Sequence, residues 1–113
     1  MLQAKTISEK PGKDDGYRLL IAYEWPAGKS ASFADGFNPS LAPSKGIYGA
    51  LLSGKLKREE FDAKYMLELD LQKERLLKLK KQAKKFQITL VCLPDLEGKS
   101  TGAAIIKKCE SLQ

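Results

Sequence analysis

The sequence contains no histidine among its 113 residues. Histidine is the side chain that most readily transfers protons near neutral pH, and it is the commonest metal ligand. Its absence excludes Ser-His-Asp and Cys-His catalysis, imidazole metal sites and a histidine pH switch. The sequence therefore indicates no catalytic residue, no metal site and no cofactor.

Cysteine and long apolar runs are also scarce. Cys92 and Cys109 are the two cysteines, and their spacing forms no paired motif, which argues against a disulfide framework and favours a reducing compartment. The longest strongly apolar run, Leu19–Ala22, is far too short to span a bilayer, and Met1–Lys5 lacks the hydrophobic region of a signal peptide. We therefore expect a cytoplasmic protein with no membrane partner.

Basic charge is unevenly distributed. The formal net charge is +6, and residues Lys73–Lys85 hold seven of the twenty basic residues but one of the fourteen acidic residues. The rest of the chain is balanced. The basic character therefore belongs to one segment, which most often means the solvated side of an amphipathic helix.

Residue periodicity predicts a single α/β domain over residues 1–113, with a short, mostly parallel sheet and helices packed on both faces. The predicted strands are Leu2–Ile7, Tyr17–Trp25 and Ile88–Leu93, of which the last two are expected to be adjacent, central and parallel, because helical crossovers link parallel strands. The predicted helices are Lys45–Ser53, Lys57–Phe86 (with a break near Asp70 as an alternative to one helix) and Ala103–Leu112. Lys29–Pro43 is expected to be an ordered loop, held to the core by Phe33, Phe37 and Leu41.

A glycine-containing loop between a strand and a helix is the clearest candidate for a ligand site. Gly98–Gly102 precedes a helix whose first backbone amides have no intrahelical partner, and such amides bind anions. The loop resembles the end of a phosphate-binding P-loop, but the first glycine of that motif would fall at Leu93. We therefore predict a simpler phosphate or anion site, as an alternative to a solvated turn, at four residues: Lys99, Ser100, Thr101 and Gly102.

Two further surfaces give alternative functions. The lysines of the basic segment predict weak, salt-sensitive contact with nucleic acid, in particular at Lys78, Lys81 and Lys85. A diverged enzyme is the other alternative, with a site at the carboxyl ends of the strands, where α/β sheets place their ligands. That site would comprise Tyr23, Glu24, Lys99 and Thr101. Cys92 lies inside an apolar strand, so a buried, unreactive thiol is expected.

Several short motifs occur in the order found in a known family. They are GYRLL (Gly16–Leu20), WPAG (Trp25–Gly28), LAPS (Leu41–Ser44), the Phe61/Tyr65 pair and ITLVC (Ile88–Cys92). With these motifs the chain resembles the small YeaO-like proteins, the domain of unknown function 488. The resemblance covers nearly the whole chain, and it implies an α/β domain rather than a particular activity.

The chain departs from the family pattern mainly at polar positions. Where relatives carry charged residues in the strand and the turn after it, this chain has Ala22, Tyr23 and Ala27. Where relatives carry arginine and histidine after the LAPS motif, it has Tyr48 and Ser53, and Thr101 or a neighbour replaces a histidine near the last helix. The scaffold residues remain while the polar groups are lost. A non-catalytic binding protein, for a phosphate-bearing ligand or nucleic acid, is therefore the favoured interpretation.

Overall fold

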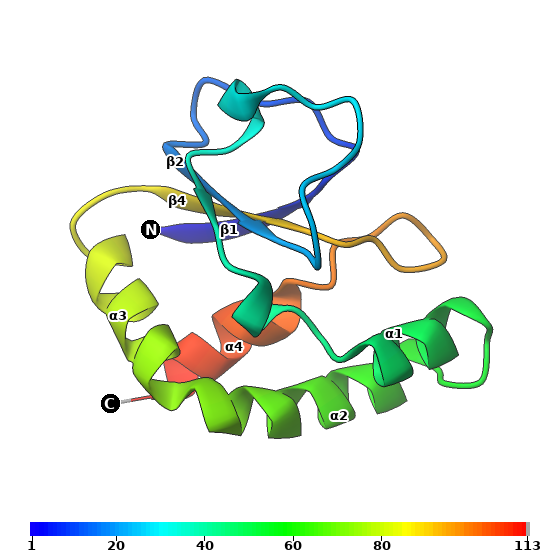
Figure 1. Cartoon of the computed structure of the whole chain (residues 1–113). Coiled ribbons are helices and arrows are strands. Elements are labelled where there is room, and N and C mark those ends of the chain that lie inside the picture. The colour runs from blue at the N-terminus through cyan, green and yellow to red at the C-terminus, as the bar shows by residue number, and fades with distance from the viewer. Residues whose placement is uncertain (113) are drawn as a thin grey trace.

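A four-stranded parallel sheet forms the centre of the computed structural model, which describes residues 1–112 (Figure 1). Its strand order is β1-β4-β2-β3. The strands are β1 (Leu2–Thr6), β2 (Tyr17–Ile21), β3 (Gly36–Phe37) and β4 (Ile88–Cys92). The predicted α/β class with a parallel sheet is confirmed.

Strand β4 lies between β1 and β2 and pairs in parallel with both. In this register Thr89 lies opposite Gln3 on one side and opposite Arg18 on the other. The prediction that the Tyr17 and Ile88 strands are adjacent, central and parallel is therefore confirmed. The Leu2 strand flanks them, as expected.

Within residues 1–112, four α-helices and three short 3₁₀-helices lie between the strands and after the last one. They are α1 (Lys45–Leu52), α2 (Arg58–Leu69), α3 (Lys73–Ala83), α4 (Ala103–Ser111), η1 (Ala31–Phe33), η2 (Pro39–Leu41) and η3 (Asp70–Gln72). Within residues 1–112, none of these helices combines the length and apolar character needed to cross a membrane.

The predicted helix Lys57–Phe86 is two helices, which the turn at η3 separates. A straight helix of thirty residues would be about 45 Å long, whereas the longest dimension of the molecule is 38 Å. The break lets Leu69, before the turn, and Leu76, after it, both lie in the core, where they are 1% and 0% exposed. The alternative of a break near Asp70 is thus confirmed.

The two faces of the sheet are covered differently (Figure 1). Side chains of all four α-helices, with Phe61 and Tyr65 of α2 among them, pack against Ile88 and Leu90 on one face. On the other face Phe33 of η1 packs against Leu20 and Val91. Helical structure therefore meets both faces, but on the second face it is one 3₁₀ turn and its flanking loops rather than an α-helix.

A charged cluster anchors the loops on this second face. The Arg18 guanidinium bonds to the Asp15 carboxylate at 2.5 Å and donates through Nε to the Phe33 carbonyl at 2.9 Å. Lys5 Nζ lies 2.7 Å from the other Asp15 oxygen. Burial of Asp15 raises its pKa, but the hydrogen bonds from Gly12, Lys5 and Arg18 outweigh burial, so the pKa is lowered and Asp15 is ionised.

Two sequence expectations need correction here. The strand predicted over Tyr17–Trp25 ends at Ile21, because the backbone bends at Ala22–Glu24 and the Tyr23 hydroxyl donates to the Pro43 carbonyl at 2.6 Å. The Lys29–Pro43 loop is held by Phe33 and Leu41, as expected, but Phe37 is 41% exposed and belongs to the edge strand β3. A strand of two residues is too short to show the alternation that identifies a strand.

Two leucines of α2 provide a test of this core. Leu69 is 1% exposed and Leu67 is 69% exposed. We expect Leu69→Ala to lower the free energy of unfolding by about 2–5 kcal/mol, because it removes buried methyl groups and leaves a cavity. Leu67→Ala is the matched control, with an expected change within about 0.5 kcal/mol. Urea denaturation measures both, and equal losses would contradict the orientation of α2.

Candidate functional site

The Gly98–Gly102 loop folds back on the end of β4 as a tight turn. Pro94 and Ser100 form an antiparallel bridge, with the Asp95 amide donating to the Lys99 carbonyl at 2.8 Å and the Thr101 amide to the Leu93 carbonyl at 3.0 Å. Gly98, with φ of 79°, adopts the left-handed conformation that closes the turn. Several loop amides are therefore already bonded to the loop itself.

The Asp95 carboxylate occupies the middle of this turn. Its Oδ1 accepts from the backbone N–H groups of Glu97 and Lys99, each at 2.9 Å, and its Oδ2 accepts from Arg58 Nη1 at 2.7 Å. Arg58 also donates to the Ser100 carbonyl at 3.0 Å. The loop thus holds a carboxylate of its own chain with the kind of donors that we predicted for an external anion.

The four predicted anion-site residues are contiguous, but their side chains point to different partners. Lys99 is 74% exposed at its side chain, and its Nζ lies 3.8 Å from the Glu97 carboxylate. Ser100 Oγ accepts from the Gly102 amide at 3.0 Å, and Thr101 Oγ1 donates to the Leu93 carbonyl at 2.8 Å. An external phosphate at this loop stays a prediction.

Cys92, at the end of β4, is buried as expected. Gly102 packs against it so closely that a Cβ there would lie 2.6 Å from Cys92 Sγ. Burial raises the pKa of the thiol to about 12, and a hydrogen bond with Ser100 offsets only part of that rise. The thiolate that nucleophilic catalysis requires is therefore absent near neutral pH.

The residues of the alternative enzyme site have separate surroundings. The Tyr23 ring packs against Tyr48, and burial raises the Tyr23 pKa to about 12. Its hydroxyl and that of Thr101 both donate to backbone carbonyls, while Glu24 and Lys99 are exposed. Two of the four groups are thereby committed to structural hydrogen bonds.

Helix α3 presents the lysines of the basic segment to solvent. Lys78, Lys81 and Lys85 are exposed; the spacing of Lys78 and Lys81 places these two on one side of α3, and Lys85 lies in the turn just after the helix. In the described part of the chain, the ion pairs involve none of these three lysines. Lys80, by contrast, donates to the Leu112 carbonyl at the end of α4. In the described residues, the predicted set is thus two lysines of α3 and one of the following turn, none of them in an ion pair.

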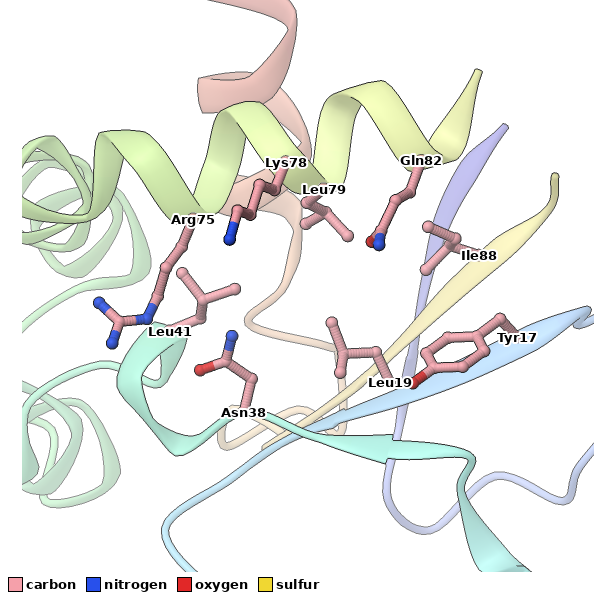
Figure 2. Close-up of a pocket in the computed structure, with 9 residues that line it drawn as sticks. All are labelled: Tyr17, Leu19, Asn38, Leu41, Arg75, Lys78, Leu79, Gln82 and Ile88. Atoms are coloured by element: carbon pink, nitrogen blue, oxygen red, sulfur yellow. The ribbon is translucent and has the colours of Figure 1, made fainter. Parts of the chain in front are cut away.

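A pocket of about 310 Å³ lies between α3 and the sheet (Figure 2). Arg75, Lys78 and Gln82 project from the helix toward it, and Asn38 faces them from the segment between β3 and η2. Its walls are lined further by Tyr17, Leu19, Leu41, Leu79 and Ile88. The volume is at the lower end of the range for small-molecule sites.

The polar groups of this pocket are predominantly hydrogen-bond donors. Asn38 Oδ1 accepts from the Ser40 amide at 3.1 Å, and Figure 2 shows the Asn38 amide nitrogen on the side of α3. Arg75 and Lys78 add two cations, and the nine lining residues, all within residues 1–112, include no aspartate or glutamate. Such a lining favours an anionic ligand.

Sequence reasoning found Lys78 but missed the other polar residues of the pocket. Asn38 lies in the segment Lys29–Pro43, for which the sequence predicts only a loop. Arg75 and Gln82 lie in the basic segment Lys73–Lys85, for which it predicts the solvated side of a helix. An arginine, a lysine and a glutamine at positions 75, 78 and 82 follow the three- and four-residue spacing of one helix face. That spacing could have identified these three residues as one polar helix face, but it does not show which part of the chain lies opposite that face.

The structure is a small parallel α/β domain. The polar groups of the loop after β4 form hydrogen bonds with one another and with Arg58. The family model described as the inactive DUF488-N3 subclade matches residues 1–108 of the chain. The chain therefore belongs to this family of unknown function, and the resemblance predicted from its motifs is confirmed. No curated protein and no solved structure matches the chain.

The turn at Asp95 gives a prediction about acid stability. Burial raises the pKa of Asp95, but the hydrogen bonds from Lys99, Arg58 and Glu97 outweigh burial and lower it. Because the folded pKa is below the unfolded value of about 3.9, the stabilisation is present above that pH and is lost as the pH falls through the folded pKa. We expect Asp95→Asn to lower the free energy of unfolding at neutral pH by about 1–3 kcal/mol and to reduce its dependence on pH in acid.

Asp62→Asn is the control for this prediction. Asp62 also bonds to Arg58, at 2.9 Å, but its side chain is 39% exposed compared with 7% for Asp95. An exposed pair of this kind contributes at most about 1 kcal/mol. Denaturant titrations from neutral to acid pH compare the variants, and equal losses would mean that the turn does not depend on the buried carboxylate.

Proposed function

We propose that this chain is a non-catalytic binding domain that holds a phosphate-bearing ligand in the pocket beneath α3. The observation that carries the proposal is the convergence of Arg75, Lys78 and the Asn38 amide on one cavity whose lining residues, within the described chain, include no carboxylate. Phosphate oxygens accept several charge-assisted hydrogen bonds at once, which suits this set of donors.

The family description supports the non-catalytic part of the proposal. The matching model is that of an inactive subclade, and the groups at the carboxyl edge have internal partners: Arg58 with Asp95, Thr101 with Leu93, and Tyr23 with Pro43. A diverged enzyme using Tyr23, Glu24, Lys99 and Thr101 is the less favoured alternative, since it would first have to break two of these hydrogen bonds.

A titration with inorganic pyrophosphate and nucleoside monophosphates, followed by backbone amide shifts, tests the proposal. We expect the first shifts at Asn38, Arg75, Lys78 and Gln82. The same spectra report on the predicted loop site at Lys99, Ser100, Thr101 and Gly102, because shifts confined to those amides would move the site there. Absence of shifts at both places to millimolar concentration would overturn the proposal.

Lys78→Gln should weaken ligand binding by about tenfold, the effect of losing one charge-assisted hydrogen bond of about 1.5 kcal/mol. Lys64→Gln is the matched control: Lys64 is also exposed, and it lies on α2 outside the pocket lining. Calorimetric titration with pyrophosphate measures both variants. Equal weakening would show that net charge, rather than the pocket, attracts the ligand.

A further inference from the structure

The basic surface of α3 continues from the pocket to the end of the helix. Lys78 lines the pocket and also a second depression along α3, which is lined by four lysines, one acid and one leucine: Lys78, Lys80, Lys81, Lys84, Glu74 and Leu77. From Lys78 to the end of α3 at Ala83 the helical rise is about 7.5 Å, and Lys85 lies two residues further along the chain. A single phosphate group placed in the pocket at Lys78 is therefore too short to contact Lys85 as well, whereas a chain of phosphates reaches both.

Two exposed aromatic rings lie at the end of this basic surface. Tyr17 and Phe86 are 41% and 44% exposed, and their rings meet edge to face with centroids 6.2 Å apart. Tyr17 also lines the pocket, where Figure 2 shows it beside Ile88 and below Gln82. This arrangement is not predictable from local sequence, because Tyr17 begins β2 and Phe86 follows α3, almost seventy residues later.

Charged residues beside exposed aromatic rings are the two elements with which proteins bind single-stranded nucleic acid. Lysines neutralise successive phosphates, and the bases stack on aromatic faces whatever their identity. In a duplex the bases are stacked on one another and do not offer a free face to Phe86. The combination therefore favours a single strand over a duplex.

We propose that the phosphate-bearing ligand of this domain is single-stranded nucleic acid. This inference rests on the proposed function of the pocket. One phosphate lies in the pocket at Arg75 and Lys78, the following phosphates lie along Lys81 and Lys85, and a base stacks on Phe86 beside Tyr17. The amides of Asn38 and Gln82 donate to the strand within the pocket. Binding of this kind selects little among sequences and weakens with salt.

Fluorescence anisotropy with a labelled single-stranded RNA of about twelve nucleotides, within the site sizes of such proteins, tests the inference. We expect Phe86→Ala to weaken binding by about 5- to 100-fold through loss of base stacking, and Phe86→Tyr to retain it. Phe37→Ala is the matched control, because Phe37 is 41% exposed and has an edge-to-face aromatic neighbour, Trp25, on the other face of the sheet. Thermal melting of each variant confirms that it is folded.

The charge contribution is tested in parallel. The affinity of the unsubstituted protein should fall steeply between about 50 and 200 mM salt, since neutralised phosphates set that slope. Replacing Lys78, Lys81 and Lys85 together by glutamine should abolish binding. Equal effects of the Phe86 and Phe37 substitutions, or equal affinity for a duplex of the same length, would overturn the inference. If a nucleoside monophosphate binds the pocket as tightly as the oligonucleotide, the inference fails while the proposed function stands; if neither binds, both fail.

Discussion

Burial of strand β4 along its whole length is the constraint on which the rest of the structure depends. All five residues of the strand are buried, and both of its edges pair with earlier strands. β1 and β2 follow one another in the chain but are not neighbours in the sheet, because β4 lies between them. The amino-terminal strands therefore form a continuous sheet only when a strand from the far end of the chain is inserted.

The same strand positions the loops as well as the strands. Thr89 Oγ1 donates to the Asp15 carbonyl at 2.7 Å and accepts from Gln3 Nε2 at 2.8 Å. Asp15 in turn binds Arg18, whose guanidinium lies over the Phe33 ring, 5.2 Å from its centroid. One hydroxyl on β4 thus links both neighbouring strands to the loop that covers the second face. A buried carboxylate and guanidinium are tolerated there because each has a partner.

Charged groups at the two candidate sites differ in whether the chain itself neutralises them. At the carboxyl end of β4, Asp95 and Arg58 are mostly shielded from water and bond to one another, since an unpaired charge in that position would be costly. On α3, Lys78 and Lys81 are exposed and remain hydrated, so they need no internal partner and stay available to an external anion. The edge where parallel sheets usually bind ligands is therefore occupied by the chain's own groups.

Sequence patterns predict the individual strands and helices better than the contacts between residues that are far apart in the chain. The run Ile88–Cys92 is apolar at every position but Thr89, which is typical of an interior parallel strand, and the strand, the buried thiol and the helix break could all be inferred from such local patterns. The two-residue strand β3 could not, because it is too short to have a period. The loop at Gly98 illustrates a different limit. Its glycines predict a turn correctly, and an aspartate that accepts from the amide two residues on is a local pattern, but no local pattern shows that the distant Arg58 also binds Asp95.

The pocket beneath α3 was not predictable because its residues come from three remote parts of the chain. Tyr17 begins a strand, Asn38 precedes a 3₁₀ turn, and Arg75 lies one turn into a helix. They meet because η3 breaks the long helical region, so that α3 turns toward the start of β4 instead of continuing in the direction of α2 (Figure 1). The break at η3 thus also helps to form the pocket. The spacing of Arg75, Lys78 and Gln82 in the sequence predicts the helical wall of the pocket. The opposite wall, with Tyr17 and Asn38, depends on the direction in which the helix runs, and only the fold shows that direction.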